Sequence, residues 1–249
     1  MFGSVGALLR IGVIAPVVMV ADVWLAQRLF PGFDQGAQFI SELGGPSAPM
    51  PEIFNFGMII AGLAGMLAGA GFTHALEHAG GRRQVSAFAG LWVAMTGLGA
   101  LFAGLFHWPD PMHRACGVGL AIQFAPLFTA WALWDRPEHK RLAWFSLGWF
   151  VGLLLVLALL TGVWNVRTGS DVGLWQRAHA LLGLVWLAIA AGTLERHWRR
   201  RVISGDDTPS VAPRQLPQGG SISRADKSSP LGEVARRAGG GLPPPYFQA

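Results

Sequence analysis

Three residues with metal-binding or acid–base side chains are spaced three apart in the stretch FHWPDPMHR, positions 106–114. They are His107, Asp110 and His113. Imidazole and carboxylate groups are good ligands for zinc and related divalent metals. Because Pro109 and Pro111 interrupt a regular helix, the spacing alone does not place all three on one face. A turn could still gather them, with Glu42 or His179 as a fourth ligand; the alternatives are a metal-free acid–base or binding site, and an interfacial turn whose histidines contact water and headgroups.

A second polar cluster lies in WNVRTGSDVGLWQRAH, positions 164–179. Paired guanidinium groups from Arg167 and Arg177 could hold a phosphate or a carboxylate. We expect Arg177 just inside the start of a helix, where free backbone N–H groups also favour an anion. The alternative is a structural pair between Arg177 and Glu42 or Asp171.

A third cluster is FISELGGPSAP, positions 39–49, followed by Asn55. Ser41 and Glu42 are its reactive side chains, and the Gly44-Gly45-Pro46 turn should fold the link back on the protein. A carboxylate this close to a bilayer either faces water or needs a partner. We therefore expect Glu42 to lie within hydrogen-bonding reach of Arg177 or of the His107–His113 turn.

One acid, Asp22, interrupts an apolar run near the N-terminus. A carboxylate inside a bilayer costs about 2.5 to 3.5 kcal/mol on insertion scales unless it is paired or hydrated. Asp22 should therefore face the interior of a helix bundle, with Arg177, His179 or Asn55 as its partner. Both a structural pair and a functional acid fit this position.

The composition indicates an integral membrane protein. Of the 249 residues, 52% are hydrophobic and 13% are charged, whereas soluble domains carry about 25% charged residues. The basic residues lie at the ends of apolar runs and in the C-terminal segment, not on one stripe, so we expect a lipid bilayer and no nucleic acid as partner. The single cysteine, Cys116, excludes an intramolecular disulfide.

Six apolar runs are long enough to cross a bilayer, which requires about 20 residues. They are roughly Ala7–Leu29, Ile53–Leu76, Ser86–Phe106, Cys116–Trp134, Leu142–Val163 and Gln176–Leu194. We predict an all-α membrane fold, a bundle of six transmembrane helices over residues 1–203. Residues 204–249 are rich in Gly, Pro and Ser without apolar periodicity, which predicts a disordered cytoplasmic tail.

Small residues recur four apart within the runs, which is typical of faces where transmembrane helices approach closely. Two such sets are Ala61, Gly65 and Gly69 in the second run, and Gly117, Ala121 and Ala125 in the fourth.

The basic residues also predict the orientation. With a cytoplasmic N-terminus, ten Lys and Arg flank the runs on the cytoplasmic side and four on the other side. The positive-inside rule then favours a multi-pass protein of the inner (plasma) membrane with both termini in the cytoplasm. The first, third and fifth links, which carry the three polar clusters, would share the extracytoplasmic face.

The order of these motifs resembles a bacterial membrane family called domain of unknown function 998. The shared features are ISELG after the first run, Asn55 early in the second, FHWPDPMH after the third and GLWQRAH opening the sixth. The resemblance covers about residues 5–200. It implies a six-helix inner-membrane protein with these polar motifs, and it implies no established reaction.

We therefore expect a polar site on the extracytoplasmic face that binds, or acts on, a lipid-linked or headgroup substrate. The candidate catalytic residues are Glu42, His107, Asp110, His113 and His179, with a divalent metal on His107, Asp110 and His113 as one option. The candidate binding residues are Arg177, Arg167, Asn55, Ser41 and Gln176, and Asp22 is the intramembrane acid. The alternative is a non-enzymatic structural or assembly partner whose outer links only pack together. A transporter is disfavoured because few polar residues line the inner half of the runs.

Overall fold

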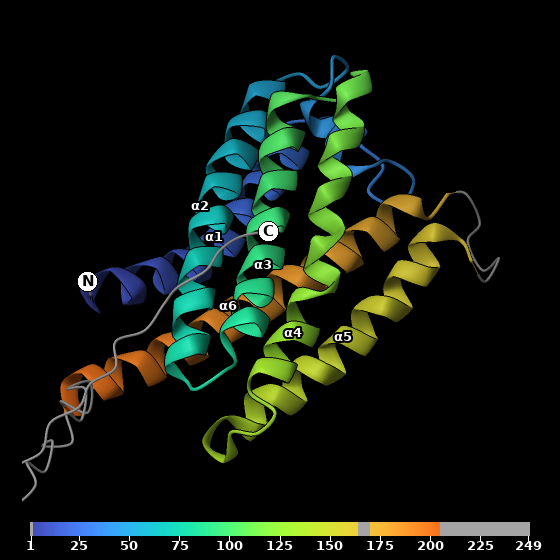
Figure 1. Cartoon of the computed structure of the whole chain (residues 1–249). Helices are drawn as coiled ribbons and strands as arrows, with labels where there is room; N and C mark the ends of the chain where they lie inside the picture. Colours follow the sequence, from blue (N-terminus) through green and yellow to red (C-terminus); the bar gives the residue numbers. More distant parts are fainter. Residues whose placement is uncertain (1, 164–169, 205–249) are drawn as a thin grey trace, which may run out of the picture. The chain divides into compact units, whose positions relative to one another are not determined.

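The computed structural model describes residues 2–163 and 170–204, and all regular structure in these ranges is helical (Figure 1). In chain order, with η for a 3₁₀ helix, the elements are α1 (Phe2–Arg28), η1 (Ile40–Gly44), α2 (Pro51–His78), α3 (Arg83–Leu105), η2 (Pro111–Gln123), α4 (Ala125–Ala132), η3 (Pro137–His139), α5 (Lys140–Thr161) and α6 (Val172–Ser204). Six stretches are long and apolar enough to cross a membrane: Val5–Arg28, Pro51–His78, Arg83–Leu105, Pro111–Ala132, Pro137–Thr161 and Val172–Ser204. The predicted six-helix membrane fold is confirmed. Apart from Ser204, the predicted tail lies outside the described residues.

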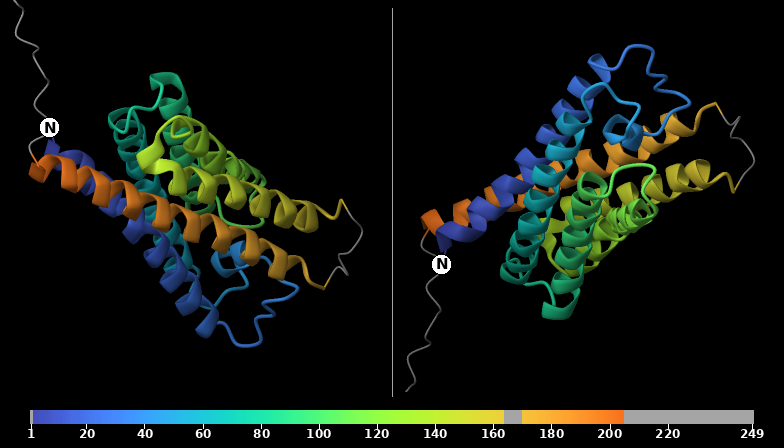
Figure 2. Two further views of the ribbon diagram at one scale, coloured as in Figure 1. Left: turned by 90° about the horizontal axis from the view of Figure 1, so that it is seen from below. Right: turned by 90° about the horizontal axis from the view of Figure 1, so that it is seen from above.

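The helices contact one another in a circular order. Each packs against the next along the chain, from α1 through α5, and α6 returns to pack against both α5 and α1 (Figures 1 and 2). Helix α2 also touches α6, where the rings of Phe72 and Trp186 lie 5.7 Å apart. Trp186 is fully buried and donates its indole N–H to the Ser146 hydroxyl at 3.1 Å. These contacts fill the half of the bundle near the N-terminus of α1, which we call the predicted inner half.

Glycines bring α2 and α3 into backbone contact. A β-carbon on Gly65 would lie 2.9 Å from the Cα of Gly97, and one on Gly69 would lie 2.5 Å from the carbonyl oxygen of Gly90. A bilayer provides little hydrophobic drive between helices, so such close packing is a main source of stability. The predicted packing face of the second run is therefore confirmed.

The fourth span differs from its prediction. Residues 111–123 form a 3₁₀ helix, and only Ala125–Ala132 form an α-helix. A 3₁₀ helix has three residues per turn, so Gly117, Ala121 and Ala125 do not share one face, and nothing lies within 4 Å of a β-carbon on Gly117. Instead Gly119 meets α3, where a β-carbon on Gly99 would lie 2.3 Å from the Gly119 nitrogen. The predicted α-helical packing face of this span is wrong.

Candidate functional site

A cavity of about 490 Å³ lies inside the bundle on the side of the 29–50 link, which we call the predicted outer half. Its walls come from α1, η1, α2, α3, η2, the end of α5 and α6. Most wall residues are apolar, including Phe54, Met58 and Leu187. The polar wall residues are Ser41, Thr96, His113, Cys116, Gln176 and His179. Four of the predicted site residues, Ser41, His113, Gln176 and His179, are thus brought to one cavity.

The 29–50 link is fastened to the start of α6 and closes the cavity at this end. The Ile40 N–H donates to the side-chain oxygen of Gln176 at 2.7 Å, and the Leu174 N–H donates to the Gly36 carbonyl at 3.1 Å. A β-carbon at Gly173 would lie 2.2 Å from the Gln38 carbonyl oxygen, so only glycine permits this approach. Gln176 is therefore a structural tie as well as a cavity residue.

Glu42 takes partners within its own link rather than on α6. One carboxylate oxygen accepts the Phe39 N–H at 2.8 Å, and the other accepts the Gln38 side-chain N–H at 2.9 Å. These bonds close the first turn of η1. The expected direct pair with Arg177 or with the His107–His113 turn is therefore wrong, because backbone and amide donors close in sequence satisfy the carboxylate first.

Arg177 binds the link through a backbone carbonyl and its own helix through another. Its Nη1 donates to the Gln38 carbonyl at 2.9 Å and to the Gly173 carbonyl at 3.0 Å. The guanidinium stacks over the Phe33 ring at 5.3 Å, and its Nε and Nη2 lie 3.3 Å from the Gln27 amide. Glu42 acts on it only as a nearby charge. Arg177 therefore places a positive charge beside the cavity, outside its wall.

The turn after α3 folds over the start of η2. His113 is buried, its Nδ1 lies 2.6 Å from the Phe106 carbonyl oxygen, and its Nε2 lies 3.6 Å from the Cys116 sulfur. The Trp108 ring meets His113 edge-on at 5.9 Å and Phe39 of the link at 6.5 Å. The first and third links thus meet over the cavity, as the topology predicts.

The other two members of the predicted metal triad point elsewhere. His107 and Asp110 are exposed, and the Asp110 carboxylate accepts the Met112 N–H at 2.7 Å as the N-cap of η2. Within residues 2–163 and 170–204, no three His, Cys, Asp or Glu side chains are grouped so that they could hold a metal ion. The three predicted ligands are therefore not brought together.

His179 joins three elements at the floor of the cavity. It is 5% exposed, and its Nε2 lies 3.4 Å from the side-chain oxygen of Gln123 in η2. Gln123 in turn donates to the Phe150 carbonyl of α5 at 3.3 Å. Gln123 and Thr96 were not predicted as site residues, because an isolated amide or hydroxyl in an apolar run carries no motif.

Asp22 and Asn55 lie outside this cavity. The Asp22 carboxyl packs so tightly on α2 that a β-carbon at Gly57 would lie 1.9 Å from its Cγ. Asn55 donates to the Gly44 carbonyl at 3.2 Å. In the described part of the chain, the buried Asp22 Oδ2 and Asn55 Oδ1 have no hydrogen-bond partner. None of the three partners expected for Asp22 binds it, so it is a tightly packed intramembrane acid.

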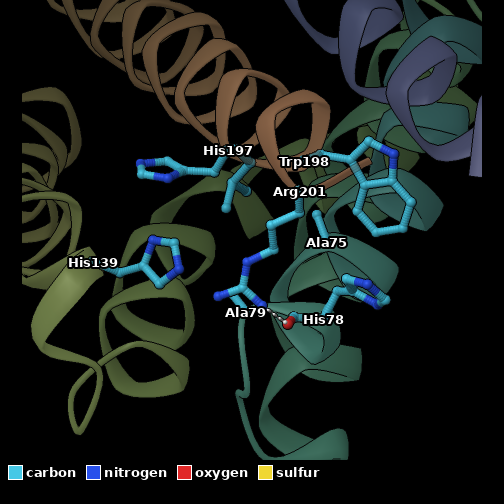
Figure 3. A pocket seen from close by; sticks show the side chains of 8 residues that line it. Ala75, His78, Ala79, His139, His197, Trp198 and Arg201 are labelled. Carbon is cyan, nitrogen blue, oxygen red and sulfur yellow. Dashed lines mark hydrogen bonds between the residues drawn. The ribbon is translucent and has the colours of Figure 1, made fainter. Parts of the chain in front are cut away.

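A histidine cluster lies at the predicted inner end (Figure 3). The rings of His139 and His197 are 4.7 Å apart, and Arg201 donates to the His78 carbonyl at 3.1 Å. The space between them is only about 10 Å³, about enough for one water molecule. This cluster ties α6 to α2 and to η3 and leaves no room for a substrate.

Arg167 lies outside the described residues, so its predicted role in the second cluster, as an anion-binding partner of Arg177, stays a prediction. Cys116 is the clearest omission from the predicted site. A lone cysteine in an apolar run reads as a small hydrophobic residue. His113 and Cys116 are three residues apart, so a 3₁₀ helix, with three residues per turn, places both side chains on the same edge.

A family model described as Protein of unknown function (DUF998) matches residues 13–193. The chain belongs to this family. The match confirms the resemblance drawn from the ISELG, FHWPDPMH and GLWQRAH motifs. No curated protein and no solved structure matches the chain. Because the DUF998 description names no activity, the function has to be argued from the site.

Proposed function

We propose that this DUF998 protein binds a membrane lipid or a lipid-linked molecule, with its apolar chain in the cavity and its headgroup at the predicted outer end. The observation that carries the proposal is that the cavity and a groove on the outside of the bundle share one wall. Met19, Ile40, Ala180 and Leu184 line both spaces.

The groove runs between α1 and α6. Near the N-terminus of α1 the two helices lie side by side, and they diverge toward the other end (Figure 2). The diverging part leaves a groove of about 420 Å³ bordered by Trp24, Gln27 and Arg177. A further space of about 580 Å³ follows along Pro16, Val17 and neighbouring residues. In a bilayer this face meets lipid, so an acyl or prenyl chain can enter sideways without crossing water.

The chemistry of both spaces suits a lipid. Binding sites for apolar ligands are mostly hydrophobic, with a few polar groups that orient the ligand, and the cavity has this composition. The Arg177 guanidinium borders the groove where the link meets α6, which suits a phosphate or carboxylate headgroup. Trp24 is 57% exposed and Arg28 stacks on it at 5.4 Å, as expected at a membrane interface. We place this end on the extracytoplasmic side of the inner membrane, following the ten-to-four distribution of basic residues.

Lipid retention tests the proposal. Ala180→Phe would place a ring in the wall that the cavity and the groove share, whereas Ala188→Phe adds the same ring to the outer space only, away from the cavity. Native mass spectrometry of detergent-purified protein should show bound lipid in the unchanged protein and in Ala188→Phe. Ala180→Phe should lower occupancy about tenfold, or about 1.4 kcal/mol.

Equal lipid retention by both variants would contradict binding inside the cavity. Absence of co-purifying lipid, together with failure to take up added phospholipid from vesicles, would instead favour the structural or assembly role.

A further inference from the structure

The cavity wall carries the only cysteine of the chain beside a buried histidine. Cys116 and His113 are three residues apart on η2. In a 3₁₀ helix, residues three apart are eclipsed, so both side chains project from the same edge and both line the cavity. The Cys116 sulfur lies 3.6 Å from His113 Nε2, within hydrogen-bonding reach for sulfur.

The partner of the other ring nitrogen decides the role of Nε2. His113 Nδ1 lies 2.6 Å from the Phe106 carbonyl oxygen. A carbonyl oxygen can only accept, so Nδ1 carries a proton, and in the neutral imidazole Nε2 is then the acceptor. Nε2 is thus oriented to accept the proton of the Cys116 thiol. Cys116 is thus the nucleophile, His113 its base, and the Phe106 carbonyl the group that orients the base, the three-part arrangement of an activated nucleophile.

The surroundings of the pair favour chemistry on an ester within a lipid. The pair faces the same apolar cavity for which we propose a lipid chain. Ser41 of η1 also lines this cavity and supplies a hydroxyl to its wall. An ester carbonyl in the cavity would share its walls with the Cys116 thiol and the Ser41 hydroxyl.

We infer that Cys116 is an acyl-accepting nucleophile with His113 as its general base, acting on an ester-linked lipid in the cavity. This inference rests on the proposed function. The thiol sulfur attacks the ester carbonyl while Nε2 takes the thiol proton. The carbon–oxygen bond to the alcohol then breaks, Nε2 returns the proton to the leaving oxygen, and the products are a Cys116 thioester and a free alcohol. No oxidant, reductant or further reactant is needed.

An activated ester tests the nucleophile directly. Detergent-purified protein mixed with p-nitrophenyl palmitate should release about one equivalent of p-nitrophenol in a rapid burst, the kinetic mark of a covalent intermediate. Cys116→Ala should abolish the burst. His113→Asn can still donate to the Phe106 carbonyl but lacks the base, so it should fold normally and slow the burst about 10²- to 10⁴-fold.

His107→Asn is the matched control, because His107 belongs to the same turn but does not line the cavity; it should keep the full burst. A burst that survives in Cys116→Ala, or one of equal rate in His113→Asn and the unchanged protein, would overturn the assignment.

Intact mass measurement supplies a test that needs no variant. Since Cys116 is the only cysteine, an added palmitoyl mass that neutral hydroxylamine removes must be a thioester on this residue. Absence of that adduct after the ester is consumed would refute the inference. Bound phospholipid, measured on the same protein, separates the two proposals. Lipid without adduct leaves lipid binding intact and removes only the acyl transfer. Adduct without retained lipid shows a reactive thiol but removes the lipid as its substrate.

Discussion

Short-range hydrogen bonds determine where the charged side chains of the outer link point. Glu42 sits one 3₁₀ turn after Phe39, whose N–H has no partner inside η1, and it caps that group. Pairing with Arg177 would require two distant segments to be aligned first, whereas the cap forms within a single turn. Arg177 then stabilises the same link from outside through the Gln38 carbonyl.

A double-mutant cycle tests this division of roles. Glu42→Ala should lower the free energy of unfolding by about 0.5 to 2 kcal/mol, as loss of a helix cap does. Glu42→Ala and Gln38→Ala should be non-additive by about 0.5 kcal/mol or more, because the two side chains bond directly. Glu42→Ala and Arg177→Ala should add nearly independently. Thermal unfolding in detergent would measure each variant, and strong coupling between Glu42 and Arg177 would show that they pair directly.

The candidate site could be predicted only in part from the sequence. Ser41, His113, Gln176 and His179, all named from the sequence, line the cavity. Cys116 could not be predicted, since its partner is a histidine oriented by a backbone carbonyl. Backbone partners leave no pattern in the sequence. For the same reason, Arg177 and Glu42 were predicted in the right neighbourhood but with the wrong partners.

At the scale of elements, glycine contacts between α2 and α3 hold the wall of the cavity. A β-carbon on Gly97 would lie 2.5 Å from the Met66 nitrogen and 2.6 Å from the Gly62 carbonyl oxygen. Both atoms belong to the backbone, so one helix would have to move to make room. Gly148 of α5 offers a contrast, because nothing lies within 4 Å of its added β-carbon.

Alanine substitutions should therefore have opposite effects at these two glycines. Gly97→Ala should destabilise the bundle by about 1 to 3 kcal/mol through overpacking. Gly148→Ala should leave stability unchanged or raise it by up to about 1 kcal/mol, since alanine is the better helix former. Thermal unfolding of both proteins in one detergent would compare them. A tolerated Gly97→Ala would mean that α2 and α3 are not held in backbone contact.

The six spans could be predicted because length and apolar content suffice to identify a transmembrane segment. The 3₁₀ form of η2 could not be predicted from length and apolar content, because an α-helix and a 3₁₀ helix both satisfy the backbone hydrogen bonds within the segment. Pro111 opens η2 and Pro126 lies in the first turn of α4, so the two prolines mark where each piece begins. At about 2.0 Å rise per residue instead of about 1.5 Å, η2 carries the wall of the cavity farther than an α-helix of equal length.

At the scale of the described bundle, the circular order of helices creates the cavity. Phe72 and Trp186 close the centre of the predicted inner half, whereas in the other half α1 and α6 diverge and the links close the end. A groove between the first and last helices borders the cavity, and Ile40, Ala180 and Leu184 line both spaces. This arrangement depends on the contacts of α6 with α1, such as the ion pair of Arg10 with Glu195 at 3.9 Å.

The orientation of the bundle decides which leaflet would supply the lipid that we propose for the cavity. Ten basic residues flank the spans on the side of both termini and four flank the other side, so the positive-inside rule predicts that the cavity end faces outward. Reporters inserted after Gly80 and fused after Ser204 should read as cytoplasmic, and one near the exposed Ser47 should read as extracytoplasmic. Arg82→Glu combined with Arg83→Glu would serve as a control, because it reduces the excess of basic residues at one inner link and leaves the other inner flanks unchanged. An external reading at Ser204 in the unchanged protein would reverse the orientation, and the lipid proposed for the cavity would then come from the cytoplasmic leaflet.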